Sequence, residues 1–155
     1  MSTPLDEYDR KILELLQEDS GRTNVALAEA IGLAPATTLE RVRKLERSGV
    51  IRRYVALVDA EKVSLGVMAL VDVQLASHES RGVDGFSEAV RSLPQVLECY
   101  HLSGETDYLL KVVAPSIEAY EKFLLERLTK VPNIGRLHTS FVLSTVKHET
   151  KMPVR

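Results

Sequence analysis

The spacing of apolar residues changes once along this chain, from a helical period to a strand period, and the change predicts two domains. Up to about residue 49, apolar side chains recur every three or four residues in short stretches separated by glycine. Over residues 67–75 they alternate with less apolar neighbours, as in a strand with one buried face. Residues 59–64 carry neither pattern and are typical of a linker. We therefore expect one domain over residues 1–62 and a second over 63–155.

Three short helices are predicted in the first domain. The first covers about residues 6–18, and Asp6 caps it because its carboxylate can accept from a free backbone N–H. The second is a short helix that ends before Gly32. The third begins at Pro35, whose missing N–H costs nothing in a first turn, and ends before Gly49.

The end of the third helix and the residues after it are strongly basic, although the net charge of the chain is -2. Residues 40–53 hold six basic residues against two acidic ones, whereas residues 1–31 hold three against seven. A local excess of Lys and Arg is what phosphate neutralisation requires. Val50 to Val58, rich in β-branched residues, predicts a strand that leaves the helical unit.

The second domain alternates strand and helix patterns in the order βαββαβ. Two strands meet at residues 104–107, which have the length and composition of a hairpin loop. The fold class is therefore α+β with a ferredoxin-like sheet, both helices covering one face. The opposite face is expected to be bare, apolar and covered by a partner. The expected elements are strand 67–75, a helix with Val83 to Leu93, strands 96–103 and 108–114, helix 117–128 and strand 134–147.

Several classes of protein are disfavoured by composition. No apolar run approaches the roughly 20 residues of a membrane helix, and the charged residues 1–17 are unlike a signal peptide, so we expect a cytoplasmic protein. Cys99 is the only cysteine, and no histidine shows metal-ligand spacing, so we expect no metal and no cofactor. Cys99 and His101 share a strand face but point in parallel without an orienting group, which disfavours a nucleophilic pair.

Ordered matches along the chain resemble the leucine-responsive and asparagine-synthetase regulator family, usually called Lrp/AsnC. The first half carries the family's helix-turn-helix pattern in Leu5-Asp6, Asp9, Ile12-Leu13, Gly21-Arg22, Leu27-Ala28, Gly32-Leu33, Arg41-Val42, Leu45-Glu46 and Gly49-Val50-Ile51. The second half resembles its amino-acid-sensing domain in residues 103–110, 139–143 and 146–147. Residues 147–153 are similar to members that answer leucine or other branched-chain amino acids. The family usually has serine where this chain has Ala34, so a capping hydroxyl is missing.

The helix-turn-helix reading predicts which side chains contact duplex DNA. The second helix of the motif places its N-terminal turn in the major groove, where Arg can bond guanine and Thr can bond a base or touch the thymine methyl. We expect base contacts from Pro35, Ala36, Thr37, Thr38 and Arg41. Phosphate contacts are expected from Arg43, Lys44, Arg47, Arg52 and Arg53.

The loop near residue 105 is the candidate effector site. A free amino acid needs an anion for its ammonium and N–H or hydroxyl donors for its carboxylate, and a glycine-containing turn can present both. Chemistry alone also allows an ordinary solvated hairpin. The resemblance implies effector binding around this loop and the last strand, at Ser103, Gly104, Glu105, Thr106, Asp107 and Thr139.

The function expected from the resemblance is sequence-specific transcription regulation, not enzymatic catalysis. A free amino acid, leucine or another branched-chain or apolar one, would shift assembly or DNA affinity. Symmetric dimers, assembled into an octamer or another ring, would read tandem half-sites with paired helices. Two alternatives remain: an enzyme similar to siroheme decarboxylases, and an architectural protein that bends DNA without an effector.

Overall fold

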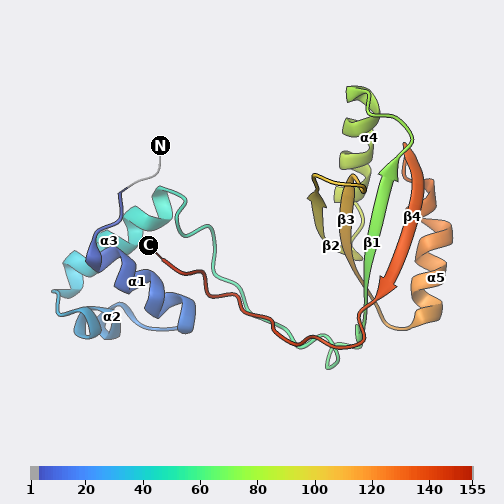
Figure 1. The fold of residues 1–155 in the computed structure, drawn as a ribbon. Helices are drawn as coiled ribbons and strands as arrows, with labels where there is room; N and C mark the ends of the chain where they lie inside the picture. The colour runs from blue at the N-terminus through green and yellow to red at the C-terminus, as the bar shows by residue number, and fades with distance from the viewer. Residues whose placement is uncertain (1–3, 155) are drawn as a thin grey trace. The chain divides into compact units, whose positions relative to one another are not determined.

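The computed structural model describes residues 4–154 and shows two compact units, each with its own hydrophobic core (Figure 1). The first unit contains the chain up to residue 57 together with 147–154, and the second contains 58–146. The tail 147–154 thus belongs with the first unit, whereas the sequence pattern placed it in a second domain over 63–155. The outermost parts of both expected domains, residues 1–3 and 155, lie outside the described residues.

Three helices form the first unit: α1 (Glu7–Glu18), α2 (Asn24–Ile31) and α3 (Pro35–Arg47). The Asp6 carboxylate accepts from the backbone N–H of Asp9 at 2.8 Å and caps α1. The Thr23 hydroxyl caps α2, which ends at Gly32 with a φ of 71°. A core cluster of Ile12, Leu13, Ile31 and Leu45 joins the three helices.

The strand expected over Val50 to Val58 is absent from the sheet of the described residues, which contains four strands of the second unit. Side chains suited to a strand give an extended backbone, but a strand also needs a partner for its N–H and C=O groups. The segment is instead held by side chains. Ile51 packs against the core of the first unit, and the Tyr54 hydroxyl donates to Glu46 at 3.0 Å.

The second unit confirms the predicted βαββαβ order. It contains β1 (Val67–Leu75), α4 (Ser80–Arg91), β2 (Val96–His101), β3 (Tyr108–Ala114), α5 (Ile117–Glu126), a 3-10 turn (Leu128–Lys130) and β4 (Ile134–Phe141). The strands pair antiparallel in the order β2-β3-β1-β4. The last strand ends at Phe141 and not near Lys147. Phe141 pairs with Ala69, and β1 begins only two residues earlier, at Val67, so most of residues 142–147 would have no strand partner.

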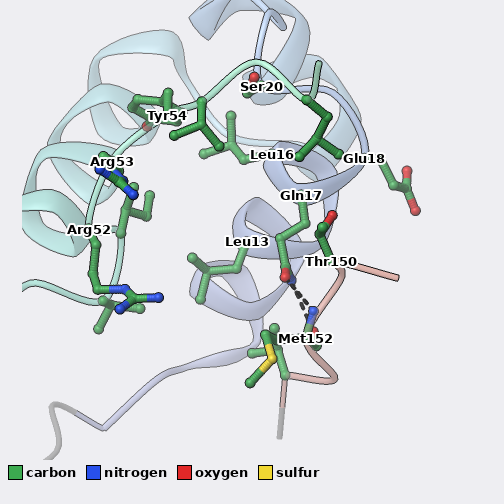
Figure 2. Close-up of a pocket in the computed structure, with 15 residues that line it drawn as sticks. Leu13, Leu16, Gln17, Glu18, Ser20, Arg52, Arg53, Tyr54, Thr150 and Met152 are labelled. Carbon is green, nitrogen blue, oxygen red and sulfur yellow. Dashed lines mark hydrogen bonds between the residues drawn. The ribbon is translucent and has the colours of Figure 1, made fainter. Parts of the chain in front are cut away.

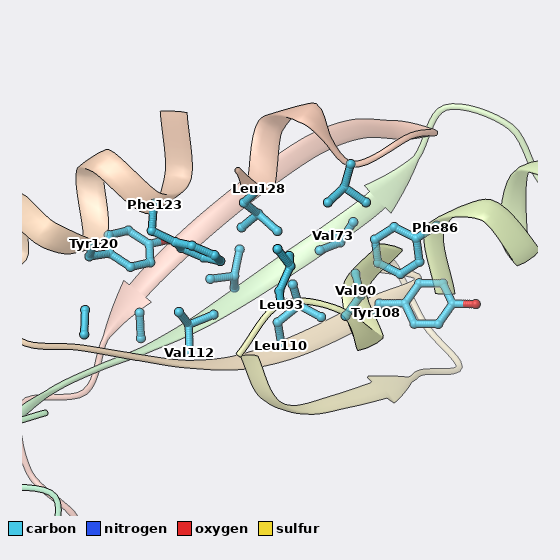
Figure 3. Close-up of a cluster of buried hydrophobic side chains, with 14 of the residues drawn as sticks. Val73, Phe86, Val90, Leu93, Tyr108, Leu110, Val112, Tyr120, Phe123 and Leu128 are labelled. Atoms are coloured by element: carbon cyan, nitrogen blue, oxygen red, sulfur yellow. The ribbon is translucent and has the colours of Figure 1, made fainter. Parts of the chain in front are cut away.

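One face of this sheet carries the core (Figure 3). Alternate residues of β1, from Ala69 to Leu75, pack with Phe86 and Val90 of α4 and with Tyr120 and Phe123 of α5 in a single buried cluster. Both helices therefore cover the same face, as the split βαβ motif requires. None of the helices in residues 4–154 is long and apolar enough to cross a membrane.

The opposite face, called here the open face, is mixed and not simply apolar as expected. On β1 it alternates with the core and carries Leu70, Asp72 and Gln74. On β4 the residues paired with Asp72 and Gln74 are His138 and Arg136, which share the open face because cross-strand partners point the same way. The open face is thus apolar around Leu70 and carries charged groups further along β1, at Asp72 and the neighbouring Arg136.

Candidate nucleic-acid interface and ligand site

One side of α3 faces solvent along its whole length. Six exposed residues recur at helical spacing on this side and form a surface called here the α3 stripe, which consists of Ala36, Thr37, Glu40, Arg43, Lys44 and Arg47. Five of these six were predicted to contact DNA, and all five are exposed. Glu40 was not predicted. The stripe combines short side chains in the first turn with cations in the later turns, the arrangement that a major-groove helix uses for bases and phosphates.

The first turn of α3 has no side-chain cap, and a hydrogen bond from α2 holds it in position instead. Ala34 occupies the cap position without a capping hydrogen bond, as the missing serine predicted. The Asn24 amide donates to the carbonyl of Pro35 at 2.7 Å, which ties the start of α2 to the start of α3. Pro35, also predicted at the interface, is exposed at this turn. The free N–H groups of the turn remain available to an anion.

Thr38 does not fit its predicted role in base contact. Its side chain is fully buried, and its hydroxyl donates to the carbonyl of Ala34 at 3.1 Å. Thr38 lies seven residues before Leu45, two helical turns away on the same buried side. It therefore fixes the start of α3 within the unit.

Arg41 also departs from its predicted role in base contact. Its guanidinium Nη1 lies 2.6 Å from Oδ2 of Asp6 and 2.8 Å from Oδ1 of Asp9, and the guanidinium lies over the ring of Tyr8. The pKa of Asp6 is lowered by the backbone N–H of Asp9 and by Arg41. Because its charge is satisfied by Asp6 and Asp9, Arg41 holds α3 against the start of α1 and is not free for a base contact in this structure.

Arg52 and Arg53, predicted to contact phosphates, lie exposed after α3 and line a hollow of about 850 Å³ (Figure 2). Within residues 4–154, no carboxylate forms an ion pair with Lys44, Arg52 or Arg53, so these cations are available to phosphate. The opposite wall of the hollow includes Met152 of the tail.

The tail is fastened to α1 by paired hydrogen bonds (Figure 2). The Gln17 amide donates to the carbonyl of Met152 at 3.0 Å and accepts from its N–H at 2.6 Å. Beside them, Lys151 Nζ lies 2.5 Å from Glu18 Oε1. The tail is thereby part of the wall around Arg52 and Arg53.

Asp107 fixes the loop that was predicted to bind an effector. Its carboxylate accepts from the backbone N–H of Leu75 at 2.7 Å and lies 2.8 Å from Nε2 of His78. Its own N–H donates to the carbonyl of Val73 at 3.0 Å. The N–H of Leu75 and the His78 side chain hold the pKa of Asp107 below its ordinary value of 3.8. Asp107 thus stabilises the geometry of the loop with both carboxylate oxygens already engaged.

A hollow of about 170 Å³ lies between this loop and the open face of the sheet. It is lined by Asp72, Gln74, Glu105, Thr106, Arg136 and His138. The Gln74 amide donates to the carbonyl of Glu105 at 2.8 Å and holds the loop over the strands. Glu105 and Thr106 were predicted at this site, and Ser103 and Gly104 belong to the same loop. The four strand residues were missed, although alternation with the core along β1 indicates that Asp72 and Gln74 share a face.

Thr139, the remaining predicted effector residue, lies on the other face of the sheet. It pairs with the core residue Val71 across the ladder, and its hydroxyl forms a hydrogen bond with the Tyr120 hydroxyl at 2.5 Å. Cys99 and His101 share a face, as predicted, and His101 stacks on Tyr108. Cys99 is exposed, but partial desolvation raises the pKa of its thiol, which disfavours the thiolate that nucleophilic chemistry needs.

Comparison with known families assigns both units. Residues 5–52 match the winged helix-turn-helix DNA-binding family, and residues 68–152 match the Lrp/AsnC ligand binding domain. The chain is 38% identical over 154 residues to the transcriptional regulator AzlB of Bacillus subtilis, covering 99% of this chain and 98% of that protein. It is 36% identical over 151 residues to the leucine-responsive regulatory protein of Escherichia coli K12, covering 97% and 92%.

Solved structures agree over nearly the whole chain. A transcriptional regulator of Neisseria meningitidis, solved as a complex with L-Met, superposes with a TM-score of 0.92 at 39% identity and covers 97% of both chains. AsnC of Escherichia coli superposes with a TM-score of 0.88 at 26% identity, covering 96% of this chain and 98% of that one. These relatives confirm the prediction of a regulator and not an enzyme. The chain belongs to the Lrp/AsnC family of transcription regulators, with a winged helix-turn-helix DNA-binding domain followed by the family's ligand-binding domain.

Proposed function

We propose that this regulator reads tandem DNA half-sites with the α3 stripe, and that a free amino acid bound at the 170 Å³ hollow shifts its assembly or DNA affinity. The DNA-binding part of this proposal rests on one observation. Thr37 is exposed in the first turn of α3, and Arg43, Lys44 and Arg47 are exposed on the same side. Arg52 and Arg53 extend the cationic surface beyond the helix. We also propose that it acts in the cytoplasm, where its DNA partner would be found.

The hollow offers the two charges that a free amino acid needs. Asp72 can accept from the ammonium, and Arg136 can donate two parallel hydrogen bonds to the carboxylate. Both come from the paired strands β1 and β4, while Ser103, Gly104, Glu105 and Thr106 form the loop above them. A volume of about 170 Å³ is small for a binding pocket and favours a single amino acid over a larger metabolite.

The relatives support an apolar amino acid. The regulator from Neisseria meningitidis was solved with L-Met, and the Escherichia coli relative is named for its response to leucine. We propose leucine, methionine or a branched-chain amino acid as the effector.

Pairing of the open faces is proposed to form a symmetric dimer, and dimers assemble into an octamer or another ring. The apolar part of the open face, with Leu70, supports this pairing, and the charges near Asp72 and Arg136 are of both signs, as a self-complementary surface requires. Leu143 and Val146, which follow the sheet, are 97% and 99% exposed. Such exposure of large apolar side chains indicates a surface that a second copy covers.

Fluorescence anisotropy with the gene's own upstream duplex and a random duplex, at one salt concentration, tests the DNA half. The full-length protein should prefer its own site by at least about a thousandfold. Thr37→Ala should weaken that preference, while the matched Thr129→Ala, on the second unit, should leave it unchanged. Equal affinity for both duplexes would instead support an architectural protein.

A thermal-shift screen of the twenty amino acids tests the effector half, because a ligand at about 100 times its dissociation constant stabilises by roughly 2.7 kcal/mol. Asp72→Asn and Arg136→Gln should remove the shift given by the best amino acid. Glu121→Gln and Arg127→Gln, which remove one negative and one positive charge at exposed positions in and just after α5, should keep it. Retention of the full shift in Asp72→Asn and Arg136→Gln would show that the amino acid binds elsewhere.

A further inference from the structure

The α3 stripe contains one carboxylate, that of Glu40. Its side chain is 64% exposed and lies one helical turn after the first-turn residues Ala36 and Thr37 and one turn before Arg43 and Lys44. Its negative charge lies on the same surface as Arg43, Lys44 and Arg47, the cations that are expected to contact phosphate. It therefore opposes DNA binding unless DNA offers it a hydrogen-bond donor.

The two oxygens of Glu40 are held by neighbouring arginines in the structure. Oε1 lies 3.2 Å from Nη1 of Arg43, and Oε2 lies 3.9 Å from Nη2 of Arg47. All three side chains are more than half exposed, so water screens these ion pairs and they exchange partners at little cost. When Arg43 and Arg47 turn to phosphates, the Glu40 carboxylate is released beside the duplex.

The donors that the major groove presents are the amino groups of cytosine and adenine. In adenine the N6 amino group stands next to the acceptor N7, which repels a carboxylate. In cytosine the N4 amino group has no acceptor of the same base beside it in the groove. A carboxylate on a groove-facing helix therefore selects cytosine and rejects guanine and thymine, whose edges present acceptors there.

We propose that Glu40 is a specificity-determining residue that accepts a hydrogen bond from N4 of a cytosine in each half-site. The inference rests on the proposed DNA-facing role of the α3 stripe. Because the carboxylate repels phosphate, Glu40 lowers affinity for every other sequence while it adds a bond to the correct one. It thus supplies discrimination that the cations of the stripe do not provide.

Selection from a random duplex library with the full-length protein tests this proposal. The wild type should enrich cytosine at one position of each half-site, with a discrimination of roughly 5- to 150-fold over the other bases. Glu40→Ala should lose the preference at that position alone. Glu40→Gln, which keeps the shape of the side chain, should change the preferred base from cytosine to adenine, because glutamine bonds N6 and N7 of adenine together.

Glu46→Gln is the matched control, since it removes the same charge from the same helix at a residue that bonds Tyr54 and lies outside the α3 stripe. It should select the wild-type motif. An unchanged cytosine preference in both Glu40 variants would overturn the inference while leaving the proposed function intact. Loss of preference at several positions in Glu40→Ala would show that Glu40 orients the helix as a whole and does not read one base, which also overturns it. A wild type that enriches no motif would overturn this inference and the proposed function together.

Discussion

Nη1 of Arg41 lies 2.8 Å from Oδ1 of Asp9, whose side chain is only 1% exposed. The same nitrogen also contacts the capping carboxylate of Asp6. One cation of α3 therefore neutralises two carboxylates at the start of α1. A buried carboxylate is costly without a partner, and Asp9 is too buried for bulk water to take the place of Arg41. The relationship makes Arg41 a stabilising residue of the first unit.

Arg41→Ala should destabilise the first unit by about 3 kcal/mol, because it leaves the Asp9 carboxylate buried and unpaired. Urea unfolding followed by circular dichroism measures this loss. The double variant Arg41→Ala with Asp9→Asn should recover part of it, since the uncompensated charge is then gone. Arg43→Ala, at an exposed position on the same helix, should change stability by no more than about 0.5 kcal/mol. An Arg41→Ala protein as stable as Arg43→Ala would contradict the assigned role.

Arg47→Ala should weaken binding to specific and random duplexes by a similar factor, because phosphate contacts carry no sequence information. The slope of log affinity against log salt should fall by about one unit in magnitude, as expected for one lost phosphate contact. Anisotropy titrations at several salt concentrations measure both quantities. Lys130→Ala, on the second unit, should leave the slope unchanged. A change of base preference in Arg47→Ala would assign it to base readout.

Asp107→Asn should lower stability near neutral pH and leave it little changed in acid. The pKa of Asp107 is below its ordinary 3.8 in the folded protein, first through the N–H of Leu75 and then through His78. A lowered folded pKa means that the charged form contributes stability above about pH 4, and that this contribution is lost as pH falls through the folded pKa. Thermal midpoints from pH 7 to pH 3 should therefore converge for the variant and the wild type.

Asp84→Asn, at an exposed position of α4, is the control for this pH series. Its thermal midpoint should follow that of the wild type at every pH. A constant difference in thermal midpoint between Asp107→Asn and the wild type over the whole pH range would contradict this. It would mean that the variant loses stability through altered hydrogen bonds to Leu75 and His78, and not through the lost charge.

Residues 58–146 expressed alone should fold and remain at least dimeric, because this unit has its own core and an open face to cover. Sedimentation velocity gives the mass. Leu70→Asp in the full chain should break the proposed dimer, since it buries a carboxylate in the apolar part of the open face. Leu125→Asp makes the same change on an exposed residue of α5 and should not alter the mass. A Leu70→Asp protein with wild-type mass would place the interface elsewhere.

Helix positions were predictable because their signals are local. Asp6, Gly32 and Pro35 act on their own turns, and each stands at the helix end where the pattern placed it. Strand ends depend on partners far away in the chain. Residues 50–58 have strand composition but no neighbour in the sheet. The last strand ends at Phe141, which pairs with Ala69 only two residues from the start of β1.

The candidate sites show the same division. The exposed residues of α3 follow from helical spacing, and the same spacing places Thr38 and Arg41 on the side of Leu45. The acidic partners of Arg41, however, lie on another helix, and only the tertiary structure brings them to it. Asp72 and Arg136 belong to strands distant in sequence, and their meeting at one hollow depends on the sheet order β2-β3-β1-β4.

The paired hydrogen bonds between Gln17 and Met152 have a consequence for synthesis of the protein. They join residues that are 135 positions apart, and the whole second unit lies between them in the sequence. Domains generally fold from the N-terminus as the chain leaves the ribosome. The helix-turn-helix therefore forms early. The tail that lines the hollow beside Arg52 and Arg53 can bind to it only after the ligand-binding unit has been translated. A nascent chain interrupted anywhere in residues 58–146 carries a DNA-binding unit with that wall missing.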